Sequence, residues 1–175
     1  MRSLLAVTLL LAGPAAGQDR PLGLPFGASM DRVKAALSAA GISCKPAGDS
    51  SWQCPRAPAD VKGAAGLRLG FEKDRLVRAE LEIDPRAKTF QAFRSRYVEL
   101  KRELTEKYGE PKTSLEYVDR FYVLADDELR AIAEGKGEFT SAWKAGELDA
   151  KLSLHGENPQ VKLTLSYERK GPMLH

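Results

Sequence analysis

The sequence contains few residues of the kinds that carry out enzyme chemistry, and their positions favour structural roles. Its two histidines are His155, which follows a strand-like pattern and precedes a glycine, and His175, the last residue. A solvated side chain at a strand end is the expected state of His155. Asp126, Asp127 and Glu128 could hold a cation, but consecutive carboxylates at a helix start usually complement the helix dipole. We therefore expect no catalytic, cofactor-binding or metal-binding residue.

Sequence motifs and composition exclude several functional classes. No signature of a zinc hydrolase, a serine hydrolase or a phosphate-binding loop occurs. The chain has 27 Lys+Arg and 24 Asp+Glu, with the two signs interspersed, so no patch for nucleic acid is predicted. One enzymatic alternative stays open, which is a small secreted hydrolase whose site is assembled from scattered Asp, Glu, Ser and Tyr residues.

The two cysteines, Cys44 and Cys54, predict a structural disulfide. The bond would close a loop of about 11 residues. A redox pair or half of a metal site is disfavoured, because the spacing is not C-x-x-C and no histidine lies nearby. Trp52 lies two residues before Cys54, on the same strand face, and is the candidate contact for a partner. For Trp143 we expect a position in the core.

The first 17 residues predict a secretory signal peptide. Arg2 precedes an apolar run over residues 4–12, and small residues follow at positions 15–17. The run is too short to span a membrane, and a buried N-terminal helix is the alternative. Cleavage after Gly17 would leave a single domain, residues 18–175, with no membrane span, in the periplasm or secreted.

A long amphipathic helix is the strongest structural signal. Residues 89–109 predict a helix that ends at Gly109, with one apolar face. That face consists of Phe90, Phe93, Tyr97, Leu100, Leu104 and Tyr108. A shorter helix over residues 30–40 has Ser29 as its expected N-cap. Another short helix is expected over residues 127–134, whereas residues 112–124 fit either a strand or a helix.

Alternating apolar and polar residues predict the strands. They cover residues 42–45, 51–54, 67–72, 77–83, 139–144, 148–154 and 161–167. The fold class is therefore α+β, an antiparallel meander sheet with one long and one short helix packed on one face. The other sheet face would be solvated or available to a partner. Both halves of the chain open with a helix and continue as a meander, which suggests a weak internal repeat.

Three segments carry a resemblance to known proteins, namely LPFGASMDRVKAAL, YVELKRELTEKYGEP and FTSAWKAG. The chain resembles small exported bacterial proteins of uncharacterised function over most of its mature length. More distantly, its helix-then-meander order is similar to modules of the outer-membrane assembly lipoprotein E family and of the β-lactamase inhibitor protein, which bind other proteins. It lacks the lipid-attachment cysteine, the helix pair and an inhibitor loop, so no functional residue is assigned from the resemblance.

These observations favour an exported, non-enzymatic binding module of the bacterial envelope. It would act through the exposed sheet face or through a hairpin formed by strands 42–45 and 51–54, which the disulfide links. The expected partner is another envelope or secreted protein, not a nucleic acid, and no cofactor is expected. The alternatives are the secreted hydrolase and an envelope structural protein without a discrete ligand.

Overall fold

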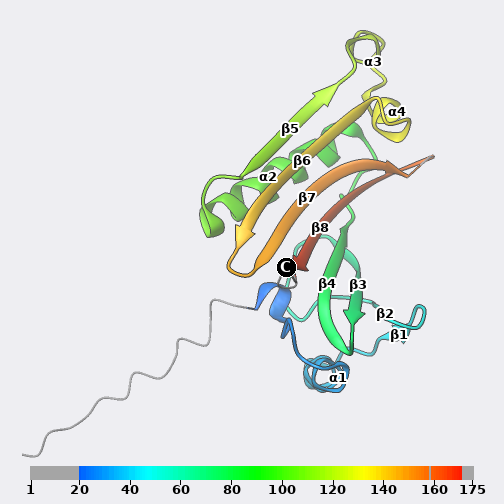
Figure 1. Ribbon diagram of the computed structural model, residues 1–175. Coiled ribbons are helices and arrows are strands. Elements are labelled where there is room, and N and C mark those ends of the chain that lie inside the picture. Colours follow the sequence, from blue (N-terminus) through cyan, green and yellow to red (C-terminus); the bar gives the residue numbers. More distant parts are fainter. Residues whose placement is uncertain (1–19, 158, 171–175) are drawn as a thin grey trace, which may run out of the picture.

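The computed structural model describes residues 20–157 and 159–170 (Figure 1). They form an eight-stranded antiparallel sheet with helices, which is the α+β architecture expected from the sequence. The predicted signal peptide, residues 1–17, lies outside the described residues. Within the described part of the chain, no helix is both long and apolar enough to cross a bilayer.

The long helix forms as predicted and is α2, Phe90–Tyr108. Thr89 caps its first turn, because the Thr89 hydroxyl accepts a hydrogen bond from the Ala92 amide (3.2 Å). Gly109 ends it with a φ of 82°, a conformation that glycine adopts without steric cost. The predicted apolar stripe faces the sheet. Arg96 is also buried, although its charge places it in the polar half of the pattern.

The shorter helix, α1, spans Met30–Ala39 and buries Val33 and Leu37. Ser29 occupies the N-cap position, but its side chain makes no capping hydrogen bond. The Met30 amide instead donates to the backbone oxygen of Asp74 (3.1 Å) and also to its carboxylate (3.3 Å). The hydroxyl cap predicted from the sequence is therefore wrong, because a turn 44 residues away supplies the acceptors.

The remaining elements complete two similar halves. The first half contains η1 (Pro21–Gly23), β1 (Lys45–Pro46), β2 (Ser51–Cys54), β3 (Ala64–Glu72) and β4 (Arg75–Ile83). The second contains β5 (Thr113–Val118), α3 (Arg120–Leu124), α4 (Glu128–Ala133), β6 (Gly137–Ala145), β7 (Leu148–Glu157) and β8 (Gln160–Arg169). The segment that sequence patterns left ambiguous is thus a strand followed by a helical turn.

The strand order reveals how the halves join. It runs β1-β2-β3-β4-β8-β7-β6-β5. Each half is therefore a four-stranded meander that follows one helix, the short α1 in the first half and the long α2 in the second. The last strands of the two meanders pair antiparallel at the centre, with Leu81 opposite Leu165 and Ile83 opposite Leu163. This seam makes one continuous sheet from the two halves.

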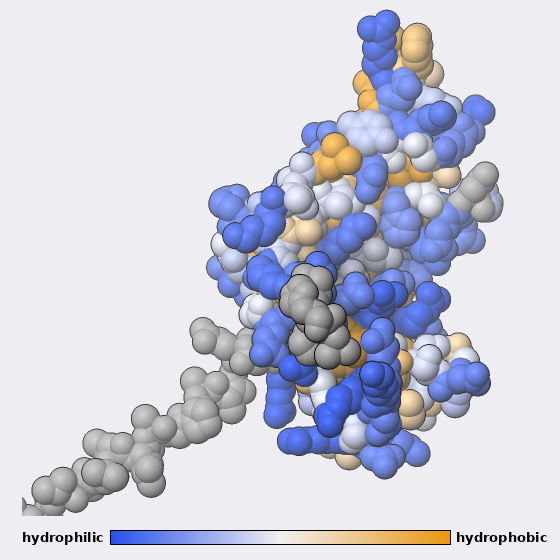
Figure 2. All heavy atoms as spheres, viewed as in Figure 1, coloured by the Kyte–Doolittle hydropathy of each residue, from blue (hydrophilic) through white to orange (hydrophobic). Residues whose placement is uncertain are grey.

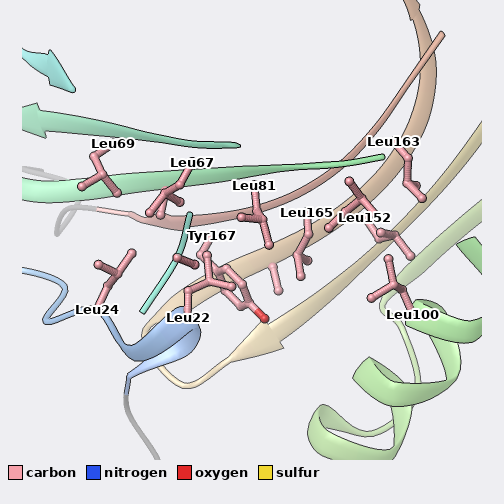
Figure 3. Close-up of a cluster of buried hydrophobic side chains, with 14 of the residues drawn as sticks. Leu22, Leu24, Leu67, Leu69, Leu81, Leu100, Leu152, Leu163, Leu165 and Tyr167 are labelled. Carbon is pink, nitrogen blue, oxygen red and sulfur yellow. The ribbon is translucent and has the colours of Figure 1, made fainter. Parts of the chain in front are cut away.

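The core lies on a single side of that sheet. Leucines of β3, β4, β7 and β8 point toward Leu100 of α2 and toward Leu22 and Leu24 of the N-terminal segment (Figure 3). Trp143 is buried there, as predicted. The turn α4 packs on the same side, because a Cβ added to Gly156 would lie 2.3 Å from the Ile132 oxygen. All the helices that pack against the sheet therefore share one face.

Candidate interaction surfaces

The sheet side opposite α1, α2 and α4, here called the open face, carries short hydroxyl side chains at its centre. Thr140, Ser153 and Thr164 follow one another across β6, β7 and β8. The Thr140 and Ser153 hydroxyls lie 3.1 Å apart. Ser153 and Thr164 are buried although they lie on the side of the sheet opposite the helices. In Figure 1, α2 lies behind β6, so Figure 2 looks onto this face, which is mainly hydrophilic.

Ion pairs between neighbouring strands surround this hydroxyl strip. Arg78 contacts Glu168 at 2.9 Å, which raises the pKa of the guanidinium through their hydrogen bond. Lys144 contacts Asp149 at 2.8 Å, and hydrogen bonds from Lys144 and Lys170 lower the pKa of that carboxyl. Because the charges are compensated in pairs, the open face has neither a basic nor an acidic footprint.

The disulfide between Cys44 and Cys54 is formed, as the sequence predicted. It links the chain just before β1 to the end of β2. Trp52 in β2 packs its ring on Phe71, with the ring centroids 4.9 Å apart. The exposed part of Trp52 borders a cavity of about 170 Å³ between the hairpin and α1, whose lining includes Leu37. Trp52 therefore faces the helix side, and its role as a partner contact stays a prediction.

A hydrogen-bonded chain connects α2 to the edge strand β5. The Tyr97 and Ser141 hydroxyls lie 2.8 Å apart, and the Ser141 and Ser114 hydroxyls 3.1 Å apart. Lys101 Nζ donates to Ser114 (2.8 Å) and to the Glu116 carboxylate (2.6 Å). Burial raises the pKa of Tyr97 to about 12, although the Ser141 hydrogen bond acts in the opposite direction. This arrangement holds β5 against the helix.

A serine beside a lysine is also a known arrangement for nucleophilic catalysis, where a neutral amine accepts the hydroxyl proton. Here the Lys101 amine donates to Glu116 in an ion pair, and an ammonium group has no lone pair for a proton. Sequence reasoning missed these residues, because Lys101, Ser114 and Ser141 lie on three elements and match no local motif. As arranged, the group is suited to anchoring more than to proton transfer.

A cleft of about 670 Å³ lies between α4, the beginning of α2 and the beginning of β8. Phe93 and Leu129 are among its apolar lining residues. Two of its charged groups are paired with each other, since Arg130 contacts Glu134 at 2.7 Å. Hydrogen bonds from Tyr122 and Arg130 lower the pKa of Glu134. A ligand in this cleft would have to compete with these internal contacts.

The remaining sequence candidates do not gather into a site. His155 lies within β7, which continues to Glu157, and its Nδ1 is buried without a hydrogen-bond partner. The strand-end position predicted for His155 is therefore wrong, because β7 continues beyond it, whereas its side chain stays partly exposed. Asp127 occupies the N-cap position of α4 without a side-chain cap, 3.7 Å from Arg130. Among residues 20–157 and 159–170, no group of three His, Cys, Asp or Glu side chains could hold a metal ion.

Comparisons with protein-family models, with curated proteins and with solved structures find no match to this chain.

Proposed function

We propose that this protein is a non-enzymatic binding module of the bacterial envelope, and that it contacts another exported protein through the open face of its sheet. One observation carries the proposal. The helices take one side of an eight-stranded sheet and leave the other side without a covering element in the described chain. A sheet of this size offers a broad and rigid platform, because its strands are fixed by backbone pairing.

The chemistry of the open face favours a protein partner. Small hydroxyl groups accept and donate hydrogen bonds, and the surrounding ion pairs provide a polar rim. The disulfide supports an oxidising compartment outside the cytoplasm. The charge balance does not favour a nucleic acid.

A matched pair of substitutions tests the open face. Ser166 lies on this face in β8, whereas Ser95 is exposed on the outer side of α2. The purified protein, with its disulfide oxidised, is immobilised and exposed to envelope and secreted proteins of the source organism. We expect wild type and Ser95→Arg to retain the same stoichiometric partner, and Ser166→Arg to lose it. If all three proteins retain the partner equally, the open face is excluded as the binding surface.

The hairpin is tested separately with Trp52→Ala. If the open face is the binding surface, this variant should retain the partner, because Trp52 faces the helix side. Loss of the partner by a folded Trp52→Ala variant would move the binding surface to the hairpin.

One observation favours the hydrolase alternative, which is the contact between Ser114 and Lys101. Incubation with ester and amide substrates, followed by intact-mass measurement, tests it. An acyl adduct that disappears in Ser114→Ala but persists in the control Ser95→Ala would establish this alternative. We expect no adduct, because Lys101 is held by Glu116.

A further inference from the structure

The two edges of the sheet differ in how they are protected against pairing with another strand. One edge is β1, which has only two residues, Lys45 and Pro46. A short strand with a lysine and a proline is a common device against edge-to-edge association. The other edge is β5, which has six residues, all but the last of them exposed, and neither lysine nor proline. The second edge is therefore available for backbone pairing.

The pairing of β5 with β6 determines which backbone groups of β5 point away from the sheet. The Asp119 amide donates to the Lys136 oxygen (2.9 Å), so odd-numbered residues direct their backbone groups toward β6. Ser114, Glu116 and Val118 consequently direct their amide and carbonyl groups outward. An added antiparallel strand must place its own outward-directed residues opposite these three.

We propose that the occupant of this edge is a second copy of the chain, paired antiparallel through β5 with Leu115 opposite Leu115. In this register Glu116 of each copy lies opposite Ser114 of the other. Lys101 already contacts both of these side chains within one chain. Each Glu116 would then lie between two Lys101 ammonium groups, which is a complementary charge arrangement.

The neighbouring register is less favourable. Shifting the pairing so that Glu116 opposes Glu116 would place two carboxylates directly opposite each other in β5. Like charges directly opposite are unfavourable, so this neighbouring register is disfavoured. The strand is thus self-complementary in one register.

Apolar side chains add surface to the backbone pairing. Leu115 and Tyr117 are exposed on the edge strand, and Phe121 and Leu124 are exposed on α3 directly after it. Leu124 is 83% exposed, which leaves nearly all of its apolar surface in solvent. Figure 2 shows hydrophobic residues at the surface of this end of the molecule. The open face would stay uncovered in such a dimer, so this inference is independent of the proposed function.

Sedimentation velocity over a range of concentrations tests the proposal, with two matched variants. Leu115 on β5 and Val98 on α2 are each 50% exposed, so lysine at either position has a similar effect on folding. We expect wild type and Val98→Lys to form dimers and Leu115→Lys to remain monomeric. A wild-type monomer at every concentration, or a dimer that persists in Leu115→Lys, would overturn self-pairing.

A charge exchange tests the register. Glu116→Lys should raise the dimer dissociation constant about tenfold, because each substituted side chain would lie between two Lys101 ammonium groups. The double variant Glu116→Lys with Lys101→Glu should restore it. A double variant as weak as the single one would contradict the Leu115-centred register. A monomeric wild type that binds an extended peptide at β5 would show that another protein is the occupant, and would contradict the proposal.

Discussion

At the scale of single residues, the most consequential side chains are polar groups inside the core. Tyr97 is fully buried and shares a hydrogen bond with Ser141, which is buried as well. Arg96 donates to the Lys62 oxygen (2.8 Å) and contacts Glu99 at 2.7 Å, so it ties α2 to the segment before β3. Buried polar groups contribute to stability only while their partners remain in place.

Tyr97→Phe should change how stability depends on pH. The pKa of Tyr97 rises from 10.0 to about 12 on folding. The folded state therefore keeps a proton that the unfolded state loses, and stability falls as the pH rises through this range. Burial also raises the pKa of Tyr167, which acts in the same direction. Tyr97→Phe removes one of these groups, so its stability should fall less steeply in alkali.

Urea unfolding at a series of pH values measures this slope. At neutral pH the variant should lose about 1 kcal/mol with the Ser141 hydrogen bond. Tyr117→Phe is the control, because Tyr117 is exposed on β5. This substitution should leave the free energy of unfolding at neutral pH and its slope in alkali unchanged. Identical slopes of stability against pH in alkali for wild type and Tyr97→Phe would contradict a raised pKa of Tyr97 in the folded protein.

At the scale of elements, the disulfide-linked hairpin gives the clearest prediction. The double variant Cys44→Ala with Cys54→Ala should lower the free energy of unfolding by about 2.5–3 kcal/mol, because the unfolded chain regains the freedom of an open loop. Denaturant midpoints measure the loss. Reductant should lower the midpoint of wild type by a similar amount and leave the double variant unchanged. A wild-type midpoint that reductant does not move would refute a stabilising role.

Elements were predictable where their signals are local. The boundaries of α2 follow from its apolar stripe, Thr89 and Gly109, which all lie within the helix or beside it. The signal at β5 was ambiguous, because residues 112–124 fit either a strand or a helix, and the exposure of the β5 side chains does not alternate. Its pairing with β6 decides its conformation. The same limit applies to the candidate sites. Alternation predicted an open sheet face, but the contact of Lys101 with Ser114 depends on how distant elements pack.

At the scale of the whole molecule, the seam between β4 and β8 determines whether the halves fold separately. Leu81 and Leu165 pair there and are buried in the same core as Leu22 and Leu100 (Figure 3). Separating the halves would expose these leucines to water, at a cost of about 25 cal/mol for each Å² of apolar surface. The shared core therefore predicts a single cooperative transition, despite the repeated helix-and-meander organisation.

The two tryptophans can test this cooperativity, because Trp52 lies in the first half and Trp143 in the second. Trp143→Phe leaves only the reporter of the first half, and Trp52→Phe leaves only that of the second. In each variant, the tryptophan fluorescence curve should coincide with the far-ultraviolet circular dichroism curve, which reports the whole sheet. If the halves unfold independently, fluorescence will change before the dichroism in one variant and after it in the other. Coincident curves in both variants would mean that the β4–β8 seam transmits the loss of either half to the entire sheet.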